Sequence, residues 1–402
     1  MNKYSNIERP IYLDRICPFI GKPIIKVLTG QRRVGKSYLM LQVIDKIKKI
    51  DENINIIYID KEKYDFDQIR NYEDLMEYCN NSEKPGQNVL FIDEIQDITE
   101  FEKALRSLYT KSNFDIYITG SNANLLSGEL ATLLSGRYIE IQVNSLSYNE
   151  FLQFQSLKNS PENFMKFIRF GGLPNLIHLP LEEDIVYDYL VNIYNTILFR
   201  DVIKRHNIRN VSFLENLIKY LADNLGSIVS AKKISDFLKS QKISISPNTV
   251  LDYLDFIQRS FCIHKVQRLD IKGKRVFEIG EKYYFEDTGL RNSIVGFRLN
   301  EIHKLLENVV YNHLRILNYD VRIGILDQQE IDFVAQKNGE EVYIQVCYLI
   351  QDQNTHDREF GNLLQINNQF PKYVLSMDAP ENSNTFKGII HKSISDFLLT
   401  FK

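Results

Sequence analysis

The sequence of 402 residues lacks tryptophan and has only four cysteines, Cys17, Cys79, Cys262 and Cys347. The cysteines lie far apart in the chain, so they form neither the paired spacing of a zinc site nor the framework of a disulfide-rich secreted domain. We therefore expect a protein of a reducing compartment without structural zinc.

Long apolar runs are also missing. Charged residues such as Lys26, Asp93 and Glu94 interrupt every apolar stretch before it reaches the length that spans a bilayer. Residues 1–15 are polar and contain no apolar signal core. These absences predict a soluble, cytoplasmic protein with no membrane partner.

The chain has no strong charge of either sign, since its formal net charge is -3 at pH 7. Nucleic-acid binding would therefore need a local basic patch. Hydrophobic residues make up 44% and charged residues 25% of the chain, which are ordinary globular values and exclude bulk disorder. The length predicts two or three domains.

Short β-branched runs alternate with helical patterns between residues 23 and 143, which is typical of a parallel sheet with crossover helices. Several runs are apolar almost throughout, as expected for strands covered on both faces. The pattern predicts strands at residues 24–28, 55–59, 89–92, 115–119 and 138–143. The predicted fold class is therefore α/β.

Residues 30–37 read Gly-Gln-Arg-Arg-Val-Gly-Lys-Ser and fit the spacing of a phosphate cradle, G-x-x-x-x-G-K-[ST], between an apolar strand and a helix. Glycines let backbone N–H groups surround phosphate oxygens, Lys36 would reach the β and γ phosphates, and Ser37 would ligate Mg²⁺. Arg32 and Arg33 are candidates for a phosphate or partner contact, although exposed loop arginines are common; the alternative for the whole loop is a turn without ligand. The predicted ATP-binding residues are Gly30, Gln31, Arg32, Arg33, Val34, Gly35, Lys36, Ser37 and Tyr38.

Two adjacent carboxylates follow the apolar run at residues 89–92, at the strand end where open α/β sheets bind ligands. Asp93 would hold Mg²⁺ through water, and Glu94 would orient and deprotonate the attacking water. Ser121 or Asn122, after the next strand, would sense the γ-phosphate or position the water. The alternative for Asp93 and Glu94 is a solvated strand end, and the alternative for Ser121 and Asn122 is a capped turn between strand and helix.

Arg137 comes just before the last predicted strand of this region. From the rim of the ATPase domain it could enter a neighbouring subunit and stabilise transition-state charge there, which implies a homo-oligomer. The alternative is a surface arginine that pairs with Glu140 or Glu129.

Together these motifs resemble the AAA-type ATPases of archaea and bacteria whose C-terminal half is a domain of unknown function. The resemblance rests on the cradle, Leu-Phe-Ile-Asp-Glu-Ile-Gln, Ile-Thr-Gly-Ser-Asn, Leu-Ser-Gly-Arg before a strand, and Gly-Gly-Leu-Pro, and it covers nearly the whole chain. The resemblance implies that Arg137 occupies an arginine-finger position and that Gly172 and Pro174 lie near the adenine. No clear second sensor arginine is present, which puts coupling of hydrolysis to lid movement in doubt.

The organisation that follows is a P-loop ATPase core at 1–146, a helical lid at 147–208, a winged helix at 209–292, and a small restriction-endonuclease-like α/β domain at 293–402. Between residues 230 and 275 there are ten Lys and Arg against four Asp and Glu. This local charge favours duplex DNA as a partner, with Lys272, Lys274 and Arg275 at phosphates. Asp252 and Asp255 on the presumed recognition helix count against it, and a protein partner is the alternative.

In the last domain, Glu307 and Asp332 fall where a PD-(D/E)xK nuclease carries two metal-binding carboxylates. Gln345 and Cys347 replace the acid and lysine of the E-x-K pair, which removes a ligand and a cation. We therefore expect an inactive scaffold, with Arg358 as the one residue that could restore a cation.

The leading functional hypothesis is an ATPase, with ATP and Mg²⁺ as cofactors, that remodels or regulates a DNA-bound or protein partner. The alternative is a nucleotide-dependent switch, or a DNA-binding regulatory module, with slow hydrolysis. An ATP-gated nuclease is disfavoured by Gln345 and Cys347.

Overall fold

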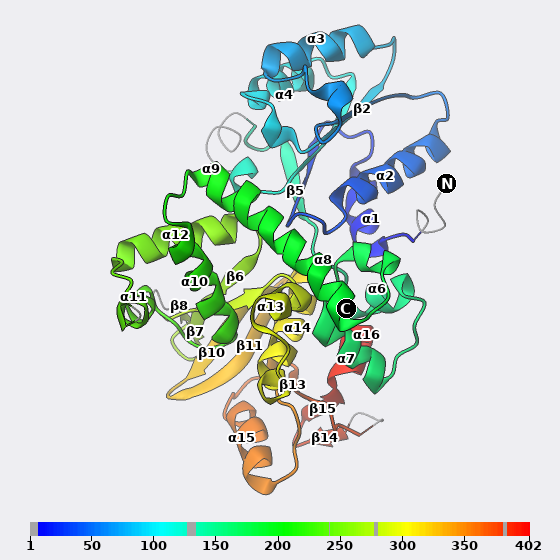
Figure 1. The fold of residues 1–402 in the computed structure, drawn as a ribbon. Helices are drawn as coiled ribbons and strands as arrows, with labels where there is room; N and C mark the ends of the chain where they lie inside the picture. The colour runs from blue at the N-terminus through cyan, green and yellow to red at the C-terminus, as the bar shows by residue number, and fades with distance from the viewer. Residues whose placement is uncertain (1–6, 127–133, 241, 277–279, 381–383) are drawn as a thin grey trace. The chain divides into compact units, whose positions relative to one another are not determined.

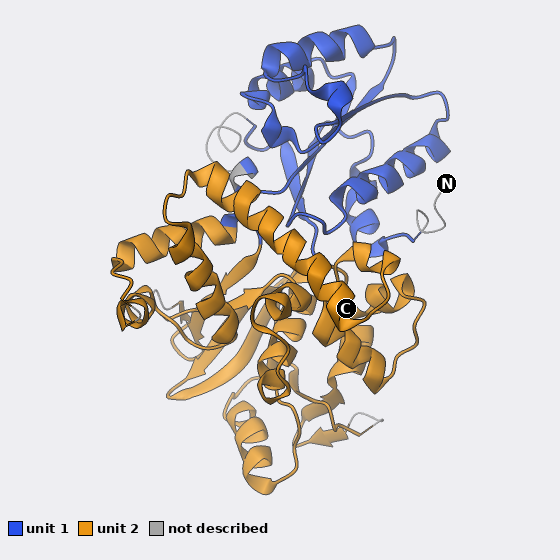
Figure 2. Ribbon diagram, viewed as in Figure 1, with its two compact units in different colours: residues 1–144, 259–261 blue, residues 145–258, 262–402 orange. Residues whose placement is uncertain are grey.

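A computed structural model describes residues 7–126, 134–240, 242–276, 280–380 and 384–402 of the chain. It divides into two compact units, shown in different colours in Figure 2. Residues 1–144 and 259–261 form the first unit, and residues 145–258 and 262–402 form the second.

The first unit is built on a parallel sheet that has five strands among the described residues, in the order β2-β3-β4-β1-β5. The strands are β1 (Ile25–Thr29), β2 (Asn55–Asp60), β3 (Asn88–Asp93), β4 (Phe114–Gly120) and β5 (Tyr138–Gln142). Each predicted strand is confirmed to within one residue at either end. Every residue of β1, β3 and β4 is buried, which explains their continuous apolar runs.

Helices cover both faces of this sheet (Figure 1). The helices are α1 (Pro10–Ile16), α2 (Lys36–Ile50), α3 (Tyr72–Ser82) and α4 (Phe101–Thr110), with 3₁₀ turns at Cys17–Phe19, Tyr64–Phe66, Ile95–Asp97 and Ala123–Leu126. The apolar faces of α3 and α4 pack on one side of the strands, with Leu75, Leu105 and Leu108 buried there. Since the strands are parallel, their carboxyl ends meet at one edge of the sheet and bring the cradle, the two acids and Ser121 together.

The second unit begins with the helical segment that the sequence predicts at 147–208. Its elements are α6 (Tyr148–Phe154), α7 (Pro161–Phe170), a 3₁₀ turn (Pro174–His178), α8 (Glu183–Thr196), a π-helical turn (Ile197–Ile203) and α9 (Lys204–His206). Ser147 caps α6 by a reciprocal capping box with Glu150, and Ser160 caps α7. The segment is therefore helical, as predicted.

Three helices follow, α10 (Val211–Asp223), α11 (Ala231–Ser240) and α12 (Pro247–Arg259), and then an antiparallel hairpin. The hairpin pairs β6 (Ile263–Val266) with β9 (Lys282–Phe285) and, nearer its tip, β7 (Arg268–Asp270) with β8 (Arg275–Val276). Helices and hairpin come in the order expected of a winged helix, and the predicted turn at Lys272 and Lys274 is at the tip. The hairpin is not a free wing, because β7 also pairs in parallel with β10 (Asp320–Leu326).

This pairing joins the hairpin to the C-terminal sheet, which has eight strands in the described part of the chain, in the order β14-β15-β13-β12-β11-β10-β7-β8. Its remaining strands are β11 (Gln329–Lys337), β12 (Glu340–Val346), β13 (Lys372–Ser376), β14 (Asn384–Phe386) and β15 (Ile389–Ser393). The helices of this region are α13 (Thr288–Val295), α14 (Ile302–Ile316), α15 (Gln353–Leu364) and α16 (Ile394–Thr400), with a 3₁₀ turn at Leu299–Glu301. Within one compact unit, therefore, the predicted winged helix and the predicted C-terminal domain share a sheet.

Candidate functional site

The cradle loop connects β1 to α2 at the carboxyl edge of the first unit's sheet. Gly30 and Gly35 both have a positive φ, at 141° and 96°, and a Cβ on Gly30 would lie 2.1 Å from the carbonyl oxygen of Val143. The loop therefore needs glycine at residue 30. Lys36 is buried and its Nζ donates to the carbonyls of Gly30 and Gln31, at 2.9 and 3.0 Å, which holds the ammonium over the loop.

Two features of this loop would suit a polar ligand. The Gln31 side chain is fully buried, and neither its Oε1 nor its Nε2 has a hydrogen-bond partner. An unpaired buried amide is costly, so it indicates a group that a ligand would satisfy. The start of α2 also presents backbone N–H groups and the positive end of the helix dipole.

Arg9 supports the loop from the N-terminal segment, although the sequence motif gives no sign of it. Its guanidinium is buried and donates to the carbonyls of Val34 and Asn144, at 2.9 and 3.1 Å. Arg9 therefore ties the cradle to the end of the sheet.

Asp93 ends β3 and lies beside the start of α2. Its carboxylate is hydrogen-bonded to the hydroxyls of Ser37 and Thr119. Burial raises the pKa of Asp93, and the two hydroxyl hydrogen bonds oppose the rise. Ser37 and Asp93, the two predicted Mg²⁺ ligands, are thus brought together.

Glu94 has a left-handed backbone, with φ of 55°, which turns its buried side chain toward the cradle. Its Oε2 accepts hydrogen bonds from Ser121, at 2.9 Å, and from Gln96, while its Oε1 lies 3.9 Å from Nζ of Lys36. Burial opposes ionisation, but the positive charges of Lys36 and Arg32 lower the pKa of Glu94. The carboxylate is therefore ionised and surrounded by donors.

Arg32 has a larger role than the motif predicts. Its guanidinium is only 4% exposed and lies 2.7 Å from Oε1 of Glu62, 3.6 Å from Oε2 of Glu94 and 3.5 Å from Oγ of Ser121. Arg33, the next residue, is exposed with a φ of 70°. The two cradle arginines are thus distinct, and Arg32 alone reaches the acidic side of the site.

The remaining predicted residues of the first unit have simpler surroundings. Val34 and Asn122 are buried, whereas Tyr38 is 53% exposed on α2. The guanidinium of Arg137 lies over the ring of Tyr109, 5.2 Å from its centroid, and Glu140 accepts a hydrogen bond from Thr29. Glu129, the other expected partner of Arg137, is outside the described residues.

Gly172 and Pro174 belong to the second unit. Gly172 N donates to Asp287 Oδ2 at 2.7 Å, and its carbonyl accepts from Leu146 N. A Cβ on Gly172 would lie 2.5 Å from the Leu146 carbonyl oxygen, so close packing inside this unit explains the glycine. The position of Gly172 and Pro174 near the adenine stays a prediction.

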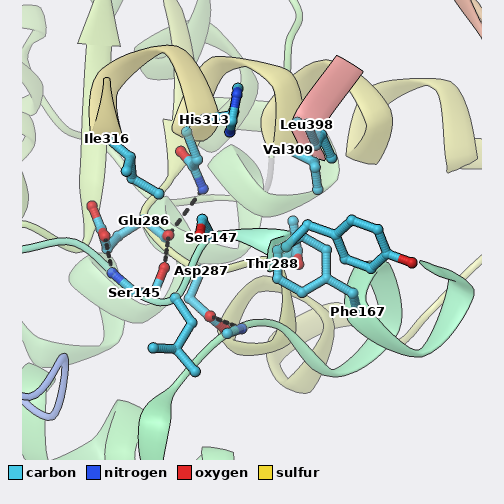
Figure 3. A pocket seen from close by; sticks show the side chains of 14 residues that line it. Ser145, Ser147, Phe167, Glu286, Asp287, Thr288, Val309, His313, Ile316 and Leu398 are labelled. Carbon is cyan, nitrogen blue, oxygen red and sulfur yellow. Dashed lines mark hydrogen bonds between the residues drawn. The ribbon is translucent and has the colours of Figure 1, made fainter. Parts of the chain in front are cut away.

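Close to this contact is a small pocket of about 20 Å³ with both polar and apolar lining, drawn in Figure 3, which has room for about one water molecule. Glu286 is buried in it, accepts from Ser145 N at 2.8 Å and lies 2.6 Å from Nε2 of His264. Burial lowers the pKa of His264 to about 4 and raises that of Asp287 to about 6. The pocket is far too small for a nucleotide, and its polar groups serve the packing of this unit.

A larger pocket of about 740 Å³ lies in the C-terminal part, where the sequence places the altered nuclease residues. Glu307 on α14, Asp332 on β11, Gln345 on β12, Cys347 and Arg358 all line it. The predicted residues therefore meet in one place. Burial, and then the negative charge of Glu307, raise the pKa of Asp332 well above its usual range.

The sequence gives no sign that two further acids and a lysine belong to this region. Glu330 and Glu359 also line the pocket, and Lys282 forms ion pairs with Glu307 and Glu330. Among the described residues, no group of three or more His, Cys, Asp or Glu side chains is arranged to hold a metal ion. No helix within the described ranges is long and apolar enough to cross a membrane.

Comparison with known proteins gives two family matches. Residues 22–152 match an AAA domain, and residues 161–301 match a domain of unknown function, DUF8612. An uncharacterized protein of Haemophilus influenzae is 35% identical over 379 residues, which are 92% of this chain and 93% of that protein. The uncharacterized protein MJ1544 of Methanocaldococcus jannaschii is 31% identical over 355 residues, which are 82% of this chain and 76% of MJ1544.

Among solved structures, a Walker-type ATPase of Pyrococcus abyssi is similar to this chain with a TM-score of 0.52 and 14% identity. The match covers 73% of this chain and 97% of the Pyrococcus protein. At this identity the likeness shows the fold alone, an α/β fold with a parallel sheet of the P-loop kind.

Proposed function

The chain belongs to the same family as the uncharacterized Haemophilus influenzae protein and contains an AAA domain at residues 22–152, and we propose that it binds ATP with Mg²⁺ and hydrolyses it. The observation that carries this proposal is the meeting of Lys36, Ser37, Asp93 and Glu94 at one edge of the sheet. Phosphate charge, metal and water each have a group of the right chemistry there.

Each residue has a role that follows from its position. Lys36 and the N–H groups at the start of α2 would bind the phosphates, and Gln31 would offer its unpaired amide. Ser37 and Asp93 would hold Mg²⁺, which supplies positive charge to the phosphate oxygens. Glu94 would take the proton of the attacking water, and Ser121 and Asn122 would help to position that water.

One observation favours slow hydrolysis. Both oxygens of Glu94 already face protein cations or donors, since Oε1 lies 3.9 Å from Lys36 and Oε2 contacts Arg32, Ser121 and Gln96. A general base with occupied oxygens must exchange these contacts for a water before it acts. A nucleotide-dependent switch with slow turnover is therefore the second candidate function.

For the partner, the hairpin tip counts against DNA. Nζ of Lys272 lies 2.7 Å from Asp327 Oδ2, and Nζ of Lys274 lies 2.9 Å from Glu341 Oε1; these are exposed surface pairs, which lower the positive charge of the tip without holding the lysines firmly. Phe237, Leu251 and Val276 in the same segment are 45%, 52% and 42% exposed. We therefore favour a protein partner for the three helices and hairpin, with duplex DNA as the competing outcome.

The test is phosphate release by the purified full-length chain with Mg²⁺, in the presence and absence of duplex DNA. We expect turnover that stops when EDTA is added and that DNA does not change. Absence of both ATP binding and turnover would refute the proposed function, and acceleration by DNA would refute the choice of partner.

A further inference from the structure

A buried lysine, Lys282, is paired with two of the acids that line the pocket of about 740 Å³ in the C-terminal part. Lys282 lies on β9 of the hairpin and is only 3% exposed. Its Nζ is 2.7 Å from Glu330 Oε1 on β11 and 3.3 Å from Glu307 Oε2 on α14. The ammonium is thus within ion-pair distance of carboxylates from two different elements.

Two further protein donors contact these acids. Tyr284 donates its hydroxyl to Glu307 Oε2, the oxygen that also faces Lys282, at 3.0 Å, and the backbone N–H of Val346 donates to Asp332 Oδ2 at 2.7 Å. One oxygen of each acid is therefore engaged, so a metal ion could not bind either carboxylate through both oxygens without displacing a donor.

Gln345 takes part in the same network. Its Oε1 accepts from the N–H of Asp332 at 2.8 Å, and its Nε2 donates to Glu359 Oε2 at 3.0 Å. Arg358 donates to the other oxygen of Glu359 from Nε and Nη2, at 2.9 and 2.6 Å. The neutral amide therefore connects the backbone of Asp332 to the carboxylate of Glu359, and Arg358 is hydrogen-bonded to Glu359.

A divalent metal in a nuclease-like fold fits this set of residues poorly. Mg²⁺ and Mn²⁺ bind to ionised, available oxygens, and an ammonium already lies within ion-pair distance of two of the acids. Two cations within a few ångströms in a buried site repel each other strongly. The residues present thus disagree with the metal that the fold resemblance implies.

We propose that the ammonium of Lys282 takes the place of the divalent cation in this pocket: it neutralises Glu307 and Glu330, fixes the hairpin to α14 and β11, and leaves a site that binds no metal. The pocket then serves to hold the C-terminal part together. If Lys282 instead acted in metal-dependent cleavage, Mn²⁺ would bind at Asp332 and DNA would be cut in a reaction that needs both residues.

The test uses full-length protein on an Asp93→Asn background, so that the proposed Mg²⁺ site of the ATPase core contributes nothing. Free Mn²⁺ is measured by electron paramagnetic resonance during titration into the nucleotide-free protein. We expect no saturable binding at millimolar Mn²⁺. Saturable binding that is lost in Asp332→Ala, or Mn²⁺-dependent cleavage of plasmid DNA that is lost in Lys282→Met, would overturn the proposal.

Thermal unfolding gives the second readout. Lys282→Met removes a buried ammonium and leaves the partly buried carboxylates of Glu307 and Glu330 without this partner, so it should lower the Tm by roughly 5–10 °C. Adding Glu307→Gln to Lys282→Met should restore part of the loss, because one unpaired charge is removed. The matched control is Lys265→Met on β6 of the same hairpin, a more exposed lysine 3.8 Å from Glu281, which should leave the Tm unchanged. Equal Tm values for Lys282→Met and Lys265→Met would contradict the role given to Lys282.

Discussion

Replacing Glu94 by glutamine separates ATP binding from hydrolysis. The amide has nearly the same shape, so it can still accept the hydrogen bond that Ser121 donates at 2.9 Å, but it carries no charge and cannot take a proton from water. Loss of a general base reduces rate by about 10²–10⁴-fold, which corresponds to roughly 2.7–5.5 kcal/mol of activation free energy. We therefore expect kcat of Glu94→Gln to fall by that factor.

Binding should respond in the opposite sense. Glu94 lies 3.9 Å from Lys36 and 3.6 Å from Arg32, and each attraction is on the order of 4 kcal/mol before the cost of desolvation is subtracted. Removing the carboxylate frees both cations for phosphate, so the Kd for ATP should stay equal to that of the wild type or decrease by up to about tenfold.

The assay combines single-turnover phosphate release with equilibrium binding of a fluorescent ATP analogue. Glu83→Gln is the matched control, since Glu83 pairs with Lys111 at the end of α3, and it should leave both quantities unchanged. Turnover of Glu94→Gln within threefold of the wild type, or loss of ATP binding in this variant, would refute the reasoning.

Further predictions concern the cradle, the rim and the hairpin. Lys36→Ala should weaken ATP binding by at least about 100-fold, because a buried ammonium over the loop is lost; equal affinity in a binding titration would exclude the cradle assignment. Gly30→Ala should also abolish binding, since its Cβ would collide with the Val143 carbonyl, and normal binding would show that the loop can move aside. Arg137→Ala should lower kcat but not ATP affinity, and mixing it with Glu94→Gln protein should restore activity if Arg137 acts in a neighbouring subunit; a monomer whose turnover per molecule is independent of concentration would exclude that role. Neutralising Lys272 and Lys274 together should change duplex affinity at low salt less than threefold, because the paired carboxylates already lower the positive charge of the tip; a large, salt-dependent loss in a filter-binding assay would restore DNA as the partner.

The parallel sheet and the cradle could be predicted because their signals are local. Buried strands of a parallel sheet appear in the sequence as continuous apolar runs. The cradle has a fixed spacing, and its two glycines, Gly30 and Gly35, adopt the positive φ that glycine allows. The position of Asp93 and Glu94 follows from the common edge of parallel strands. Each of these features can therefore be recognised from a short stretch of sequence.

What the sequence could not predict depends on contacts between distant segments. Arg9 contacts Val34, 25 residues further along the chain, and Arg32 contacts Glu62, 30 residues further along. No motif links either pair of segments. The parallel pairing of Leu269 with Gly324 adds the hairpin to the C-terminal sheet, and neither strand shows that partner in its periodicity. Lys282 reads as part of an ordinary strand, and only the packing of β9 against α14 and β11 brings it to Glu307 and Glu330.

ATP binding and hydrolysis are best measured together, by calorimetric titration of ATP into the purified chain with Mg²⁺ and then by phosphate release from the same sample. We expect one ATP bound per chain, binding lost in Lys36→Ala, and release that requires Mg²⁺ and Glu94. A chain that binds no ATP at millimolar concentration, or that binds ATP equally well without Lys36, would contradict the proposed function.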